Sequence, residues 1–100
     1  MAEDGFKEKV AIIGLGLLGT SLAMALGAAG YQVLGWTRRQ EIREWAVADG
    51  VVKATADRAD DVLAQADITV LCLPIPEIVA FIRAHAAAWR PGSIVTDIGS

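Results

Sequence analysis

The sequence has little of what most often reveals a function: it contains one cysteine, one histidine and no large excess of charge. The single cysteine, Cys72, excludes an internal disulfide, and its apolar neighbours favour a buried thiol in a reduced protein. A net charge of −3 does not provide the positive potential with which proteins bind nucleic acids and acidic membranes. We therefore expect a cytoplasmic protein without a nucleic-acid partner.

Catalytic side chains are equally scarce. The sequence contains no cluster of metal ligands, no Cys/His pair and no nucleophile elbow, so we expect no metal site. The only histidine, His85, is expected late in a helix over residues 77–89, about 12 Å from the helix start at 1.5 Å per residue. We expect it to be a packing or surface residue. Three aspartates are expected to form the solvated start of a short helix rather than a carboxylate site: Asp57, Asp60 and Asp61.

Charge is absent from residues 10–37, a run that is long enough to span a bilayer. Six glycines interrupt this run where helices and strands are expected to end, and Gln32 adds a polar group. The preceding residues 1–9 mix both signs of charge, and no segment resembling a cleavage site follows them. We therefore expect neither insertion into a membrane nor secretion.

The sequence is rich in apolar residues, which make up 54% of its 100 residues and are enough for the core of one domain. Apolar, β-branched segments alternate with segments of helical periodicity. Strands are expected at residues 9–14, 31–36, 51–54, 67–73 and 93–98, and helices at 17–30, 39–49, 58–65 and 77–89. This alternation predicts an α/β fold with a doubly wound parallel sheet of Rossmann type and strand order 3-2-1-4-5.

Three glycines lie where the first strand turns into the first helix. Gly14 permits a tight turn, Gly16 leaves room for a pyrophosphate, and Gly19 lets the helix approach the sheet. The amides of Leu17 and Leu18 would then point toward the phosphates at the positive end of the helix. This pattern predicts a dinucleotide site; the alternative is a tight turn without a ligand.

The end of the second strand indicates which dinucleotide is preferred. A site that selects NAD has an acidic residue there, whereas this chain has Trp36-Thr37-Arg38-Arg39. A hydroxyl and two guanidinium groups suit a 2′-phosphate, so we expect NADP to be preferred over NAD. Trp36 is a candidate contact of the adenosine half. Thr37 would also cap the next helix, with Gln40 completing a capping box.

Four segments resemble the prephenate/arogenate dehydrogenases: VAIIGLGLLGTSLA at 10–23, VLGWTRR at 33–39, ADITVLCLPI at 66–75 and GSIVTDIGS at 92–100. The most specific features are Ser21, two residues after the last motif glycine, and the closing TDIGS. The related β-hydroxyacid dehydrogenases usually have methionine where this chain has Leu18.

The resemblance implies oxidative decarboxylation of prephenate or arogenate in tyrosine biosynthesis, with hydride transfer to NAD(P). It implies that the glycine turn holds the pyrophosphate and that Leu73, Pro74 and Ile75 line the cofactor. It also implies that Ser100 lies beside the nicotinamide and hydrogen-bonds the substrate, as the one catalytic contact in this chain.

The chain also departs from this family. Thr37 stands where relatives often have aspartate, and the catalytic histidine of the family, in a glycine-histidine-proline stretch, is absent. The sixth strand and the helical second domain, through which the family forms homodimers, are absent too. We therefore expect residues 1–8 to be a tail and residues 9–100 to be the dinucleotide-binding portion of a longer enzyme, inactive by itself. The alternatives are a portion of an NADP-dependent β-hydroxyacid or imine reductase and a non-catalytic nucleotide sensor.

Overall fold

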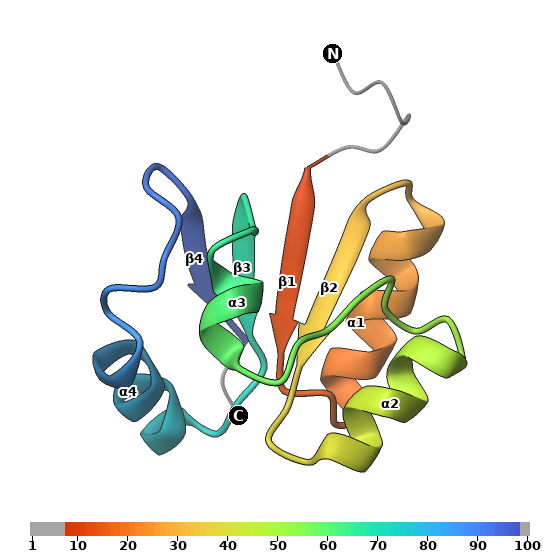
Figure 1. The fold of residues 1–100 in the computed structure, drawn as a ribbon, viewed down its shortest axis with the longest axis horizontal. Coiled ribbons are helices and arrows are strands. Elements are labelled where there is room, and N and C mark those ends of the chain that lie inside the picture. The colour runs from red at the N-terminus through yellow and green to blue at the C-terminus, as the bar shows by residue number, and fades with distance from the viewer. Residues whose placement is uncertain (1–7, 99–100) are drawn as a thin grey trace.

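The computed structural model describes residues 8–98 and shows helices on both sides of a four-stranded sheet (Figure 1). The strands are β1 (Lys9–Ile13), β2 (Gln32–Trp36), β3 (Ile68–Leu71) and β4 (Ile94–Asp97). The helices are α1 (Leu17–Ala28), α2 (Gln40–Ala48), α3 (Ala59–Leu63) and α4 (Ile75–Ala84). All three strand pairings are parallel, in the order β2-β1-β3-β4. The predicted doubly wound α/β fold is confirmed.

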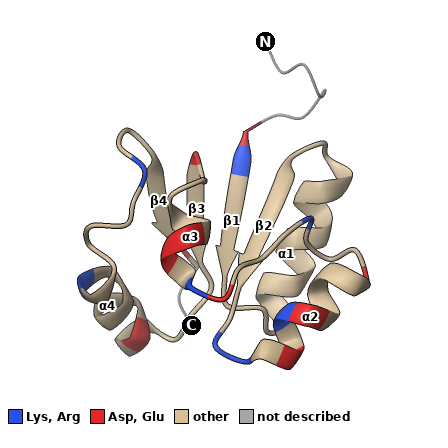
Figure 2. Ribbon diagram, viewed as in Figure 1, with Lys and Arg blue, Asp and Glu red and all other residues tan. Residues whose placement is uncertain are grey.

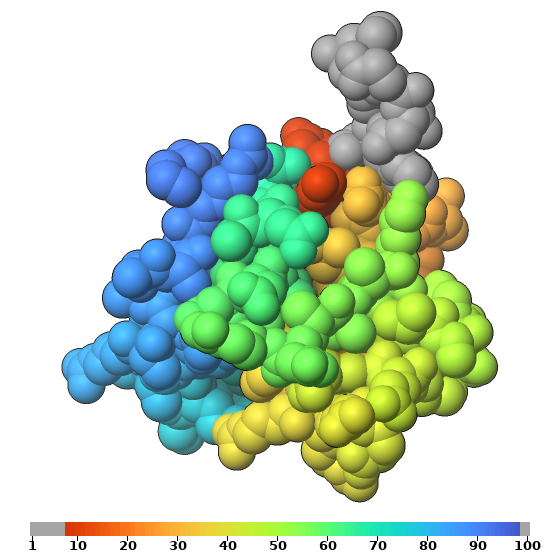
Figure 3. Space-filling model, viewed as in Figure 1, coloured from red at the N-terminus to blue at the C-terminus, as the bar shows by residue number. Residues whose placement is uncertain are grey.

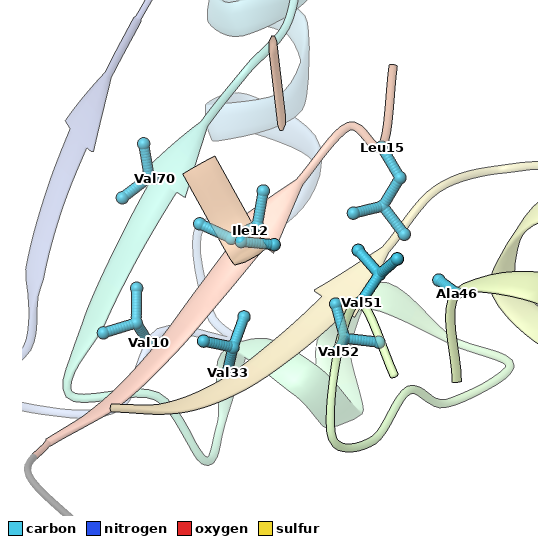
Figure 4. Packing of buried hydrophobic residues seen from close by; sticks show 9 residues of the cluster. Val10, Ile12, Leu15, Val33, Ala46, Val51, Val52 and Val70 are labelled. Carbon is cyan, nitrogen blue, oxygen red and sulfur yellow. The ribbon is translucent and has the colours of Figure 1, made fainter. Parts of the chain in front are cut away.

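Alternation along β1 divides the core between the two faces of the sheet. Val10 and Ile12 pack with side chains from α1 and α2, as Figure 4 shows for part of this cluster. Ala11 and Ile13 point to the opposite face, where α3 and α4 cover the sheet. All four residues are at most 2% exposed. A strand buried on both faces is continuously apolar, which is why the segment KVAII contains no polar residue after Lys9.

The third strand expected at residues 51–54 is reduced to a single bridge. Ala54 pairs in parallel with Leu34 of β2 and accepts a hydrogen bond of 3.1 Å from the Gly35 amide. The amides of Val51 and Val52 instead donate to the carbonyl of Ala46 at the end of α2. Because these amides satisfy the helix end, the segment joins the sheet only at its last residues.

The fourth helix is shorter than the expected 77–89, since it runs from Ile75 to Ala84 and His85 is its C-cap. Pro76 is tolerated in the first turn because a backbone N–H at this position would have no hydrogen-bond acceptor within the helix. Beyond the helix end the chain turns, and Trp89 packs edge-on against Phe81 with ring centroids 6.2 Å apart. The helix therefore ends before Pro91, the residue at which the sequence predicted its end.

No helix within residues 8–98 is long and apolar enough to cross a membrane. Every residue of the outer strand β4 is exposed, and the exposed fraction of Ile94 is 61%. Its exposure contrasts with β1 and β2, whose central residues are buried.

Candidate functional site

Two glycines of the turn after β1 are required by close backbone packing. Gly14 has φ +99°, and a Cβ there would lie 2.3 Å from the carbonyl oxygen of Cys72. A Cβ at Gly19 would lie 1.9 Å from the carbonyl oxygen of Gly14. No side chain fits at such distances, so helix α1 approaches the end of β1 as closely as a backbone permits.

Gly16 differs from these two glycines because a Cβ there would meet nothing within 4 Å. It is the N-cap of α1, and no side chain caps the helix. The helical bonding begins with the amide of Thr20, which donates to the Gly16 carbonyl at 2.9 Å. Within the described part of the chain, the amides of Leu17 and Leu18 therefore have no acceptor. Open space and free donors at a positive helix end suit an anion such as a pyrophosphate.

A cavity of about 320 Å³ lies at the carboxyl ends of β1 and β2, between the loop that follows β2 and helix α4. Its size is in the range of small-molecule sites. In parallel α/β sheets, ligands bind at this edge, where the strand order reverses. The lining includes Gly14, Trp36, Thr37, Arg38, Leu73 and Phe81. The structure thus brings five of the predicted cofactor-binding residues to this cavity: Gly14, Trp36, Thr37, Arg38 and Leu73.

Of the two arginines that were predicted to bind a 2′-phosphate, only one lies at the cavity. Arg38 lines the cavity. Arg39 is the N-cap residue of α2, is 71% exposed in its side chain, and pairs with Glu41 at 2.9 Å. Only Arg38 is thus placed to contact a ligand in this cavity.

The capping box predicted for Thr37 and Gln40 is wrong. Helix α2 starts at Gln40, so Thr37 lies too far ahead to be its N-cap, and no side chain caps this helix. The Gln40 amide group donates to Glu44 at 2.9 Å instead. Thr37 has no part in starting the helix through its side chain, which lines the cavity.

Arg43 holds the loop after β2 and was missed by the sequence analysis. Its side chain is nearly buried, and its Nη1 donates to the carbonyl oxygens of Thr37 at 2.7 Å and of Arg38 at 3.1 Å. Its guanidinium also lies 5.8 Å from the centre of a Trp36 ring. The available signal was its position three residues before the buried Ala46, on the same face of α2.

Helix α4 contributes a carboxylate to the mouth of the cavity. Glu77 lies in the first turn of α4, and its Oε1 is 3.2 Å from Nη2 of Arg38. Figure 2 shows the basic loop after β2 and the acidic start of α4 at the lower edge, and Figure 3 shows these segments in contact there. The side chains are 80% and 47% exposed, so this ion pair contributes about 0–1 kcal/mol.

The far end of α4 carries the single histidine of the chain. His85 packs on Phe81 with ring centroids 4.2 Å apart, and its Nδ1 lies 2.5 Å from Oδ1 of Asp60 in α3. This hydrogen bond is the main cause that holds the pKa of the Asp60 carboxyl below its ordinary value. His85 is the packing residue that was expected, but it also lines the cavity. Asp57 and Asp61 are exposed at the start of α3, as expected, and Asp60 keeps 37% of its side chain exposed beside His85.

Only the first residue of the predicted cofactor-lining segment 73–75 lines the cavity. Leu73 lines the cavity, Pro74 is the N-cap residue of α4, and Ile75 is 60% exposed. Burial raises the pKa of the neighbouring Cys72 thiol, which favours the protonated form. Ser100 lies outside the described residues. No group of three or more His, Cys, Asp or Glu side chains within residues 8–98 could hold a metal ion.

Residues 9–100 match the family of the NAD binding domain of 6-phosphogluconate dehydrogenase, and the chain belongs to this family. Cyclohexadienyl dehydrogenase of Zymomonas mobilis is 32% identical over 95 residues, which are 93% of this chain and 32% of the relative. Prephenate dehydrogenase of Lactococcus lactis is 30% identical over 96 residues, which are 93% of this chain and 27% of the relative. The chain thus spans about a third or less of these relatives.

Solved structures extend the comparison. Arogenate dehydrogenase of Synechocystis superposes with a TM-score of 0.86 at 35% identity, over 92% of this chain and 33% of that one. 3-Hydroxyisobutyrate dehydrogenase of Mycobacterium tuberculosis superposes with a TM-score of 0.81 at 26% identity, over 92% and 31%. The resemblance to prephenate/arogenate dehydrogenases is confirmed, and the chain is a Rossmann-type NAD-binding domain of the dehydrogenases.

Proposed function

We propose that this chain is the cofactor-binding portion of a prephenate/arogenate-type dehydrogenase that prefers NADP(H) over NAD(H). The observation that carries this proposal is the cavity lined by Gly14 and Arg38, together with the open space at Gly16 two residues after Gly14. The start of α1 provides free amides for a pyrophosphate, and the cavity lining provides a guanidinium for a 2′-phosphate. We propose residues 1–8 as a tail and 9–100 as the binding portion.

The start of α1 and the residues that line the cavity have separate parts in holding the cofactor. The amides of Leu17 and Leu18 would bind the pyrophosphate, for which Gly16 leaves the space. Arg38 would pair with the 2′-phosphate beside the Thr37 hydroxyl. Trp36 and Leu73 would cover the adenosine half. The nicotinamide itself supplies the acceptor of a hydride, and the protein supplies its position.

The reaction proposed for the whole enzyme is oxidative decarboxylation of prephenate or arogenate in tyrosine biosynthesis. The similarity of the chain to a prephenate dehydrogenase and to an arogenate dehydrogenase supports this reaction. Ser100 would contact the substrate, and a C-terminal domain would supply the catalytic histidine and the homodimer contact. We place this enzyme in the cytoplasm. A reductase of β-hydroxyacid type is the second candidate, supported by the likeness to 3-hydroxyisobutyrate dehydrogenase.

Cofactor titration tests the proposal. Tryptophan fluorescence of the chain should report binding because Trp36 lines the cavity. We expect NADP(H) to bind about tenfold more tightly than NAD(H), since one hydrogen bond between charged groups contributes roughly 1.5–3 kcal/mol. Arg38→Ala should remove this preference, and Thr37→Asp should reverse it.

Arg39→Ala is the matched control, because it removes the same charge one residue away and outside the cavity. It should leave the preference within about twofold, the change expected of a screened surface charge. Equal loss of preference in Arg38→Ala and Arg39→Ala would refute a specific contact with the 2′-phosphate.

A further inference from the structure

The cavity is lined by one acidic side chain and one permanently charged basic side chain, and the two face each other. Among the described residues these are Glu77 and Arg38, which come from α4 and from the loop after β2. They are separated by 39 residues in the sequence. The end of β2 contains no carboxylate, but the fold delivers one to the same place from another element.

This carboxylate has opposite effects on the two cofactors. A 2′-phosphate bound by Arg38 would take the place of Glu77 as its partner and would lie within a few ångströms of a like charge. A ribose 2′-hydroxyl would instead find an acceptor in Glu77, the part that an acidic residue at the end of the second strand takes in NAD sites. The pair is exposed enough to open, because the side chains are 80% and 47% accessible.

We propose that Glu77 is a specificity-determining residue that weakens binding of NADP(H) and strengthens binding of NAD(H). This inference rests on the proposed cofactor site. It adds a second residue, whose effect on the preference between the two cofactors is opposite to that of Arg38. The selectivity of the site is the outcome of competition for the Arg38 guanidinium between an internal carboxylate and the 2′-phosphate.

Glu77→Gln tests the inference, because glutamine keeps the size of the side chain and removes the charge. We expect the affinity for NADP(H) to rise about five- to tenfold, the range for one charge interaction near a protein surface. The affinity for NAD(H) should fall about twofold, because an amide oxygen is a weaker acceptor than a carboxylate. Calorimetric titration of both cofactors gives both constants, and circular dichroism verifies the fold.

Glu41→Gln is the matched control. Glu41 also pairs with an arginine of the same loop, Arg39, but neither residue lines the cavity. It makes the same change in net charge and should alter the ratio of the two affinities by less than about twofold. In the Arg38→Ala background, Glu77→Gln should raise NADP(H) affinity less than in the unmodified chain, because the competition for the guanidinium is gone.

The results separate this inference from the function on which it rests. An equal ratio shift in Glu77→Gln and Glu41→Gln would overturn the inference and leave the proposed cofactor site in place. An unmodified chain that binds neither cofactor would overturn both. A selective rise in NADP(H) affinity with Glu77→Gln supports both.

Discussion

The candidate site has two walls, the β1–α1 turn and the side formed by Arg38 and Glu77, and they are built in different ways. On the wall of the β1–α1 turn, backbone packs against backbone, so that a Cβ at Gly14 or Gly19 would lie within 2.3 Å of a carbonyl oxygen. On the opposite wall, Arg38 and Glu77 meet through exposed side chains from two distant segments. Gly14 and Gly19 cannot accept a side chain, whereas Arg38 and Glu77 are free to change without disturbing the core.

This difference separates two properties of the site. Holding a dinucleotide depends on the shape of the glycine turn, which the packing of α1 against β1 enforces. Choosing between two dinucleotides depends on exposed charges, whose contribution to stability is small. Variants on the first wall should therefore affect the fold or all binding, and variants on the second only selectivity.

The largest effect is expected at Gly19. Gly19→Ala places a methyl group against the Gly14 backbone, which cannot move without opening the turn. We expect the free energy of unfolding to fall by about 3 kcal/mol or more, as in severe overpacking. Denaturant unfolding followed by circular dichroism measures this loss.

Gly27→Ala is the control in the same helix. A Cβ there meets nothing within 4 Å, so alanine should stabilise the protein by about 0.5–1 kcal/mol through its higher helix propensity. If Gly19→Ala were as stable as Gly27→Ala, the close approach of α1 would be unnecessary and the contrast between the walls would disappear.

The next effect concerns binding at the same wall. Gly16→Val fills the open space at the start of α1, where the pyrophosphate is expected, and its Cβ would meet nothing within 4 Å. We expect a folded variant, destabilised by about 1 kcal/mol as a poor N-cap. Its affinity for both cofactors should fall by about 100-fold or more, because hydrogen bonds to the phosphates are lost. Unchanged affinity by calorimetry would reduce the motif to a simple turn.

The smallest effect is expected at the hydrogen bond between His85 at the end of α4 and Asp60 of α3. Because His85 lowers the pKa of Asp60 in the folded state, the unfolded chain binds the proton more readily. The stability from this pair is therefore present above about pH 4 and lost as the pH falls through the lower, folded-state pKa. Unfolding curves of Asp60→Asn should show a weaker dependence on pH between about pH 5 and 3 than those of the unmodified chain.

Asp61→Asn serves as the control for this measurement. Asp61 is the next residue of α3 and is exposed, without a histidine partner among the described ion pairs. Its variant should keep the pH dependence of the unmodified chain. The same flattening in both variants would mean that general charge, not the contact with His85, governs acid stability.

The sequence by itself determined the order of strands and helices and the geometry of the glycine turn. Both can be recognised from patterns of residues close in the chain: continuous apolar runs are typical of buried strands, and the spacing of Gly14, Gly16 and Gly19 is typical of this turn. The fold class and the family were accessible for this reason. Local signals also placed Thr37 and Arg38 at the end of β2, where they line the cavity.

Only the tertiary structure decided which charges meet at that cavity. Glu77 reaches Arg38 because β3 lies beside β1 and positions the start of α4 opposite the loop after β2. The hydrogen bond of His85 with Asp60 and the single bridge of Ala54 with Leu34 likewise join distant segments. Propensity and spacing describe neighbours along the chain, whereas an ion pair between separate elements forms only when packing brings its two side chains together.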